Sequence, residues 1–184
     1  LSLGSMNSST FSDILVQNCT GDGISFGNGS YRLSFQNVQS FSNDGNGFTI
    51  TGTVSITRCS FLDCLANYNG GVGFSFNART NDMTSMNLLG CNAVFNTGDG
   101  FDFSATSSSD TNTAVVNCIS TDNGGIGFDV DNNFQRISFS NCYADANAGD
   151  GFEIGAPNCK IVGCYSSTPL DLSNSVVAVG NSFA

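Results

Sequence analysis

Acidic side chains recur at one position of a repeating pattern and are the residues best suited to chemistry in this sequence. The pattern is a glycine, an apolar residue, a central residue and a second apolar residue, and it occurs six times. The central residues are Ser25, Thr49, Ser75, Asp102, Asp129 and Glu153. The last three copies therefore carry a carboxylate. If the copies stack in register, these carboxylates lie side by side, and such like charges are destabilising unless something compensates them.

Three explanations for this acidic row stay open at the level of sequence. Calcium is the candidate cofactor, because Asp oxygens on neighbouring copies can converge on a hard cation; the candidate ligands are Asp99, Asp102 and Asp129. Glycoside hydrolysis is the second, with Asp102, Asp129 and Glu153 as candidate catalytic residues. Carboxyl groups on neighbouring copies, about 5 Å apart, would suit a retaining mechanism, and groups two copies apart, about 9.6 Å, an inverting one. The third explanation is a solvated acidic face that serves solubility.

Other acidic residues surround these positions. Asp99 and Asp150 stand directly before the glycine of their copies, and Asp131 follows Asp129 by two residues. We expect all three to border the acidic row.

The repeat itself identifies the elements that must position these residues. The apolar residues that directly follow the six glycines are separated by 24, 26, 27, 27 and 24 residues. A second anchor lies ten residues before that position and is Val38, Cys64, Cys91, Cys118 and Cys142. Residues five and three places before the anchor are mostly apolar, as in Cys59 and Phe61, which is typical of short strands with one buried face.

Each full repeat also has an asparagine five residues after the anchor, namely Asn43, Asn69, Asn96, Asn123 and Asn147. Side-chain amides at one turn position can hydrogen-bond along a stack, so we expect an asparagine ladder. We expect the recurring phenylalanines Phe48, Phe74, Phe101, Phe128 and Phe152 to form the core. Because Val38 shares the cysteine position, we expect a reduced internal cysteine stack, with Cys59–Cys64 or Cys159–Cys164 as the candidate disulfides if any forms.

A unit of this length with short strands cannot bury its apolar side alone, so it must stack on the next unit. The predicted fold is all-β, a right-handed parallel β-helix of about seven coils. We expect one domain over residues 1–184, with clear repeats from about Ile14 to Leu172, as a segment of a longer chain or assembly.

Composition excludes several classes of function. The formal net charge of −10 disfavours binding to nucleic acid and to anionic membrane surfaces. The absence of histidine removes catalytic triads with a histidine base and most zinc sites. No stretch approaches the roughly 20 apolar residues of a membrane helix, so no membrane insertion is expected.

The spacing in Asn117-Cys118 to Asn123-Gly124-Gly125-Ile126-Gly127-Phe128-Asp129 resembles the pectate-lyase-like superfamily of parallel β-helices. That superfamily includes polysaccharide lyases, hydrolases, alginate epimerases and phage tailspikes, so the resemblance implies the fold more than one function. The stretch Asn96-Thr97-Gly98-Asp99-Gly100-Phe101-Asp102 is similar to the Asp-Gly-x-Asp motif of calcium-dependent pectate lyases, which implies Asp99 and Asp102 as ligands.

The chain departs from the lyases where they have a basic catalytic residue. The corresponding outward position here is Glu153, and the basic residues Arg32, Arg58, Arg79, Arg136 and Lys160 fall at different repeat positions. The histidine motifs of polygalacturonases and epimerases are absent.

Resemblance to phage tailspikes and tail fibres implies a virion-tail or extracellular location and a homotrimer, or flanking domains that cap the open ends. Our leading hypothesis is a carbohydrate-binding domain that cleaves a surface polysaccharide. The alternatives are a non-catalytic structural or assembly module, which would require large apolar residues at outward positions where the sequence indicates few, and a calcium-dependent polysaccharide lyase.

Overall fold

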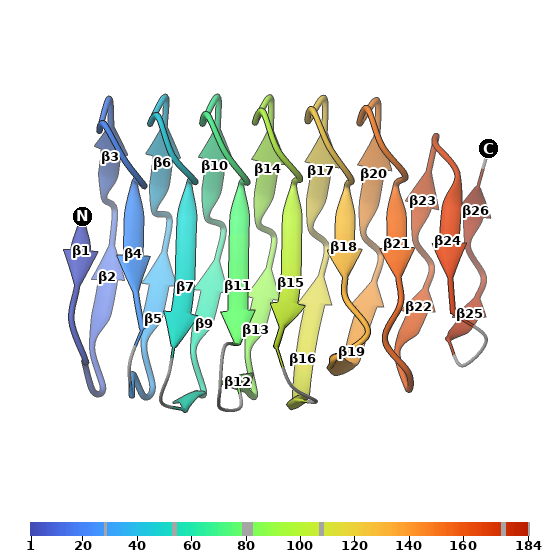
Figure 1. Ribbon diagram of the computed structural model, residues 1–184, viewed down its shortest axis with the longest axis horizontal. Helices are drawn as coiled ribbons and strands as arrows, with labels where there is room; N and C mark the ends of the chain where they lie inside the picture. The colour runs from blue at the N-terminus through green and yellow to red at the C-terminus, as the bar shows by residue number, and fades with distance from the viewer. Residues whose placement is uncertain (28, 53–54, 79–82, 107–108, 174–175, 184) are drawn as a thin grey trace.

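The protein is a solenoid of parallel strands, seen in a computed structural model that describes residues 1–27, 29–52, 55–78, 83–106, 109–173 and 176–183 (Figure 1). The described residues contain strands and turns and no helix, and three of the four sheets have eight strands. Each lap contributes one strand to each of these three sheets. The all-β parallel solenoid predicted from the sequence is therefore confirmed.

The front sheet faces the viewer in Figure 1 and carries the acidic row. Its order is β1 (Ser2–Leu3), β4 (Ile24–Phe26), β7 (Phe48–Gly52), β11 (Phe74–Ala78), β15 (Phe101–Ala105), β18 (Phe128–Val130), β21 (Phe152–Ile154) and β24 (Leu170–Leu172).

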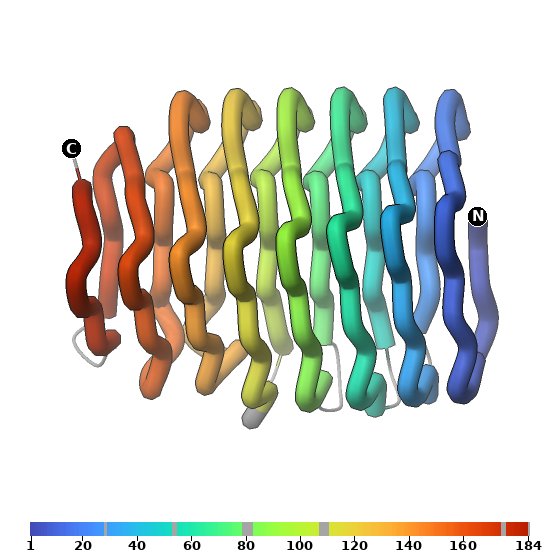
Figure 2. Tube along the Cα trace, turned by 180° about the vertical axis from the view of Figure 1, so that it is seen from behind, coloured from blue at the N-terminus to red at the C-terminus, as the bar shows by residue number. Residues whose placement is uncertain are grey.

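Two further sheets form the back of the solenoid (Figure 2). The lower back sheet contains β2 (Thr10–Ser12), β5 (Ser34–Gln36), β9 (Ser60–Leu62), β13 (Asn87–Leu89), β16 (Ser109–Val116), β19 (Phe134–Ser140), β22 (Lys160–Val162) and β25 (Val177–Val179). The upper back sheet contains β3 (Leu15–Gln17), β6 (Gln39–Phe41), β10 (Leu65–Asn67), β14 (Asn92–Val94), β17 (Ile119–Thr121), β20 (Tyr143–Asp145), β23 (Tyr165–Ser166) and β26 (Ser182–Phe183). A small fourth sheet pairs β8 (Ile56–Thr57) with β12 (Met83–Thr84).

The number of laps differs slightly from the expected seven, because each long sheet has eight strands. The short strands β1 and β24 extend the front sheet at its two ends. These end laps pack less well than the middle ones: all three residues of β25 are exposed, whereas the corresponding central residue of β22, Ile161, is buried.

Stacked phenylalanine rings form the core behind the front sheet. Phe48, Phe74, Phe101, Phe128 and Phe152 are all buried, and neighbouring rings stack with centroids 4.6 to 4.9 Å apart. The preceding glycine permits close packing between laps: a Cβ on Gly73 would lie 2.6 Å from the Gly100 carbonyl oxygen and 2.8 Å from the Ala93 Cβ. The Gly-Phe pattern is thus required by the contact between laps.

The asparagine ladder is confirmed. The first four ladder amides donate to the Oδ1 of the asparagine on the next lap, at 2.9 Å from Asn43 to Asn69 and from Asn69 to Asn96, 3.0 Å from Asn96 to Asn123 and 2.9 Å from Asn123 to Asn147. The last amide, of Asn147, donates to the Ser120 carbonyl at 2.9 Å. All five side chains are buried. The ladder fixes the turn between the upper back sheet and the front sheet on successive laps, and so sets the register of the acidic row.

The cysteine anchor is buried as expected, and all eight cysteines are free. Neither candidate disulfide is formed. Burial raises the pKa of the Cys59 and Cys159 thiols, so both remain protonated and poorly nucleophilic at neutral pH. Cys59 and Cys159 therefore act as small core residues.

The residue before each anchor separates the two back sheets. It adopts a left-handed backbone conformation on every lap, with φ of 50° at Asn37, 51° at Asp63, 67° at Gly90 and 52° at both Asn117 and Asn141. Asparagine, aspartate and glycine tolerate this conformation best. Figure 2 shows the resulting kink in the backbone midway along each lap, seen from behind.

No helix within the described residues is long and apolar enough to cross a membrane.

Candidate functional site

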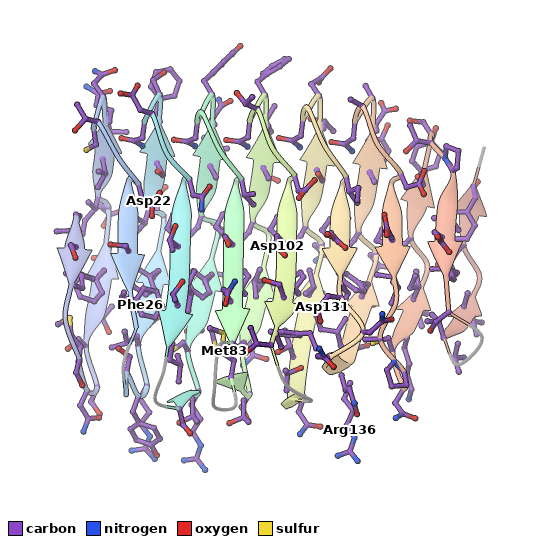
Figure 3. All side chains as sticks on the ribbon, in the orientation of Figure 1. Asp22, Phe26, Met83, Asp102, Asp131 and Arg136 are labelled. Atoms are coloured by element: carbon purple, nitrogen blue, oxygen red, sulfur yellow. The ribbon has the colours of Figure 1, made fainter. Side chains whose placement is uncertain are left out.

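The predicted acidic row exists as an in-register line along the middle of the front sheet. Ser75 pairs with Asp102, Asp102 with Asp129, and Asp129 with Glu153. Neighbouring parallel strands lie about 4.8 Å apart, so each carboxylate is within reach of the next. Figure 3 shows Asp102 at mid-height on the front sheet.

The row is one residue longer than the sequence indicated, because Asp171 pairs with Glu153. Asp171 escaped detection because its copy of the motif begins with Pro169 in place of glycine, and Leu170 replaces the phenylalanine. The alternation Leu170-Asp171-Leu172 after Cys164 is the signal that could have revealed it. Four consecutive laps therefore present a carboxylate.

Asp102 is half-buried among hydroxyl groups. The Ser75 hydroxyl donates to Asp102 Oδ2 at 3.3 Å, and the Ser104 hydroxyl donates to the same oxygen at 3.5 Å. Burial, followed by the negative charge of Asp99, raises the pKa of Asp102 to about 6, although the two hydroxyl groups act in the opposite direction.

Asp129 is the carboxyl group most easily protonated in this row. Burial raises its pKa to about 7, and the charges of Asp102, Asp99 and Glu153 add to the effect. Near neutral pH, Asp129 is therefore partly protonated while Asp102 on the preceding lap, with the lower pKa, is mostly ionised. This is the combination that acid/base chemistry needs.

Asp99 and Asp131 already accept hydrogen bonds from the backbone. Asp99 Oδ1 accepts from the Ile126 amide at 2.7 Å, and Asp131 accepts from the amides of Ala105, Asn133 and Phe134 at 2.8, 2.8 and 3.1 Å. Both border the row, as expected, and their charges act on Asp129. Their first role is to hold turns, so they are less available to a ligand than the sequence indicated.

Asp150 occupies the same repeat position as Asp99. The Asp150 carbonyl oxygen accepts a hydrogen bond from the Gly127 amide at 2.8 Å, and Asp150 is half-buried. This position therefore connects laps through its backbone as well.

An open hollow of about 480 Å³ lies beside the C-terminal half of the row. Its lining includes Asp129, Glu153 and Asp171 from the row, with Asp131, Asn132 and Ser173 next to them. The hollow gives the row a place where a polar ligand could sit against three carboxyl groups.

The calcium prediction stays a prediction. Asp102 and Asp129 pair directly, and Asp99 is near enough for its charge to act on both. Among the described residues, no group of three or more Asp, Glu, Cys or His side chains is arranged to hold a metal ion.

The basic residues lie away from the row. Arg32 and Arg58 contact the Tyr31 ring at the turn that leads from the front sheet to the lower back sheet, and Lys160 begins β22. Arg136 points from the lower edge in Figure 3, and Arg79 lies outside the described residues. Within the described part of the chain, the outward row of the front sheet therefore contains no basic side chain next to Asp102, Asp129 or Glu153.

Comparison with family models identifies this architecture. Residues 2–166 match the model of the family described as a right-handed β-helix region. The chain belongs to this family. The comparison with curated proteins gave no match.

Two solved structures show a distant likeness to this β-helix. Both are of trypsin-treated QnrB1, a plasmid-mediated fluoroquinolone resistance protein. One has 9% identity, covers 96% of this chain and 92% of the other, and has a TM-score of 0.29. The second has 14% identity, covers 100% of this chain and 91% of the other, and has a TM-score of 0.27. At these scores the likeness supports no conclusion about function.

The carboxyl pair should make the stability of the β-helix depend on pH. The pKa values of Asp102 and Asp129 rise from 3.8 to about 6 and about 7, so between pH 4 and 7 the folded chain binds more protons than the unfolded chain. Stability is therefore greatest with both groups protonated and falls as the pH rises. The two shifts at face value correspond to a decrease of about 4 kcal/mol in the free energy of unfolding from pH 5 to pH 8. Because Asp129 is partly exposed and solvent screens its charge, we expect urea denaturation to give about 2–3 kcal/mol.

Asp129→Asn should remove most of this dependence and make the variant more stable than the natural chain at pH 8. Asp44→Asn, at an exposed turn residue, is the matched control and should leave the pH profile unchanged. Equal pH profiles for Asp129→Asn and the natural chain would contradict the prediction.

Proposed function

We propose that this chain is a carbohydrate-binding β-helix that hydrolyses a polysaccharide on its front sheet. The observation that carries the proposal is the pairing of Asp129, whose pKa is about 7, with carboxylates on both neighbouring laps beside an open hollow. Glycosidases need one protonated and one ionised carboxyl group on either side of the bond they break.

In the proposed mechanism, Asp129 is the general acid and Glu153 the nucleophile, since both line the hollow. Asp129 donates its proton to the glycosidic oxygen as the bond from that oxygen to the anomeric carbon breaks. Glu153 attacks that carbon and forms a glycosyl ester. Asp129, now ionised, then takes a proton from water while the water oxygen attacks the anomeric carbon. This attack breaks the glycosyl ester, releases the sugar and restores the Glu153 carboxylate.

Asp102 has a supporting role in this mechanism. Its charge is the largest electrostatic contribution to the raised pKa of Asp129 and so keeps the general acid protonated near neutral pH. The spacing of about 4.8 Å between adjacent laps is close to the 5–5.5 Å separation typical of retaining enzymes. The proposal therefore includes retention of configuration at the anomeric carbon.

The setting that fits this function is a virion tail or an extracellular protein, where surface polysaccharides are met. Flanking domains or further subunits would cover the edge strands at the open ends of the solenoid. The net charge of −10 favours a neutral glycan over an anionic one.

The test is release of reducing ends from a panel of capsular, lipopolysaccharide and plant cell-wall glycans. The natural chain should release ends from at least one glycan, and Asp129→Asn and Glu153→Gln should each reduce the rate about a hundredfold, as expected for loss of a general acid or a nucleophile. Asp44→Asn is the matched control. Unchanged release by both variants would remove these residues from catalysis.

A calcium-dependent lyase is the second enzymatic candidate, supported by the resemblance around Asp99 and Asp102. It would abstract a proton from the sugar and eliminate the glycosidic oxygen, forming an unsaturated product that absorbs in the ultraviolet. Calcium-dependent appearance of that product would favour the lyase, and its absence alongside reducing-end release would favour hydrolysis.

A structural or assembly role is the non-enzymatic alternative. The sequence indicated few large apolar residues at outward positions, and the structure corrects this: Leu89, Phe95, Ile119, Tyr143 and Val162 are all exposed. The outward residues of the two back sheets were not recognised as one surface because the left-handed residue between the sheets interrupts their alternation.

A further inference from the structure

An uncharged apolar surface runs along the back of the solenoid, opposite the acidic row. It consists of Leu89, Val116, Ile119, Tyr143, Val162 and Tyr165, which we call the apolar stripe. Leu89, Ile119, Tyr143 and Val162 are 43%, 38%, 38% and 40% exposed. Contiguous apolar surface of this kind on a soluble protein marks an interaction site more often than a free surface.

The register of the back sheets makes the stripe continuous. Leu89 pairs with Val116 in the lower back sheet, and Ile119 pairs with Tyr143, which pairs with Tyr165, in the upper one. The Tyr143 and Tyr165 rings stack with centroids 4.7 Å apart. Two polar residues belong to these rows, Ser140 between Val116 and Val162 and Asn92 beside Ile119. Between the rows stand a buried cysteine and a turn residue, which on these laps is Gly90, Asn117, Asn141 or Gly163. The stripe therefore crosses four laps without a charged side chain.

Charge is distributed unequally between the two sides. Asp102, Asp129, Glu153 and Asp171 all lie on the front sheet, and the chain has a net charge of −10. Two copies that met through their front sheets would bring these rows together. Two copies that meet through their backs keep the acidic rows on opposite outer surfaces.

The back also has the size and composition of a protein interface. The laps from β13 to β25 leave out the exposed Asp13 and Asp63 of the earlier laps. Five strands at about 4.8 Å and nine residues per lap at about 3.3 Å give a face of about 700 Å², within the roughly 600–1,000 Å² that each partner buries in a standard interface. Around the stripe lie polar and charged residues such as Ser60, Ser138, Asp63, Lys160 and Asp145, and the Tyr143 hydroxyl donates to Asp145 Oδ2 at 3.1 Å. An apolar centre with tyrosines and a polar rim is the usual anatomy of an interface.

We propose that a second copy of this chain packs on the apolar stripe and forms a back-to-back dimer. A two-fold axis parallel to the solenoid places the lower back sheet of each copy over the upper back sheet of the other, which makes the contact self-complementary. Lys160 in the lower sheet and Asp145 in the upper sheet, on adjacent laps, then face each other with opposite charge. This dimer differs from the homotrimer implied by the tailspike resemblance, and it does not depend on the proposed enzymatic activity.

Sedimentation equilibrium of the full chain at about 50 µM tests the proposal, since a complex of standard interface size is assembled at that concentration. We expect twice the monomer mass of 19.1 kDa. Ile119→Arg places a charge at the centre of the stripe on an exposed side chain and should weaken dimerisation at least tenfold. Ser25→Arg, on the outward face of the front sheet, is the matched control and should sediment as the natural chain does.

Circular dichroism and thermal melting of each variant should match the natural chain, because both substituted positions are solvent-accessible. A second variant, Val162→Lys, repeats the measurement at another lap. A natural chain that sediments as a monomer or a trimer would overturn the proposal. A dimer that persists in both stripe variants would do so as well, since it would have to use another surface.

Discussion

Replacing Asn96 by alanine should lower the free energy of unfolding by about 4 kcal/mol. The Asn96 amide donates to the Ala66 carbonyl and to Asn123 Oδ1, both at 3.0 Å, and its Oδ1 accepts from the Asn69 backbone amide at 3.1 Å and from the Asn69 side chain at 2.9 Å. All three asparagines are buried. Removing the side chain deprives the buried Asn69 backbone amide of its acceptor, which costs about 1–3 kcal/mol. It also removes one hydrogen bond each from the Asn69 side chain, the Ala66 carbonyl and Asn123 Oδ1, at about 1 kcal/mol per bond.

Urea denaturation followed by circular dichroism measures this loss. Asn92→Ala is the matched control, because Asn92 is a half-buried outward residue of β14 on the same lap and should lose less than about 1 kcal/mol. If the two variants were equally stable, the ladder would contribute little, and the stacking of rings would be left as the main determinant of register.

Phe101→Ala should destabilise the solenoid by about 3–5 kcal/mol, the usual cost of removing a fully buried ring. The Phe101 ring lies between those of Phe74 and Phe128, with centroids 4.9 and 4.8 Å away and interplanar angles of 3° and 8°. Its backbone is hydrogen-bonded to both neighbouring laps, so the laps cannot close around the cavity without breaking their pairing. The stacked rings above and below would lose their contacts on one side.

The same denaturation experiment tests this prediction, with Phe95→Ala as the control. Phe95 is 45% exposed, stacks on Tyr68 at 4.9 Å and lies on the preceding part of the same lap. We expect its replacement to cost about 1 kcal/mol or less. A loss at Phe101 no larger than at Phe95 would mean that the ring stack is not the core on which the solenoid depends.

Sequence was sufficient for the fold because the features that set it recur with the repeat. The Gly-Phe pairs, the small buried anchor and the ladder asparagines each return once per lap, and the spacing between them identifies which side chains face inward. The repeat pattern is weaker in the end laps. Asp171 belongs to a lap in which the loop after Cys164 is shortened and proline stands where glycine is expected, so the repeat pattern fades there.

The state of the candidate site could not be read from the same pattern. Asp99, Asp102, Asp129 and Asp131 are the same residue type, but two of them accept backbone hydrogen bonds and two are half-buried with raised pKa values. What separates them is whether a backbone amide lies within reach. Asp99 meets an amide of the next lap and Asp131 meets amides of the preceding lap and of its own turn, whereas Asp102 meets only hydroxyl groups. That depends on turn geometry, which varies from lap to lap with the length of the connection.

The apolar stripe was missed for a related physical reason. Outward residues of one strand alternate with buried ones, but the left-handed residue at each junction shifts the alternation between the two back sheets. Leu89 and Ile119 therefore appear unrelated in the sequence although they lie on one surface. The stripe becomes visible only when strands of both sheets are placed side by side.

The stacking of laps on their nearest neighbours also constrains how such a chain can change its length. A duplication or deletion of one complete lap, such as the 27 residues that separate Phe101 from Phe128, would leave every remaining ring above a ring and every ladder amide above an amide. A single-residue insertion inside a strand would turn the following side chains to the wrong face. The molecule is therefore a modular rod, in which evolution or protein engineering can extend the acidic surface by whole laps while the spacing between its carboxyl groups stays the same.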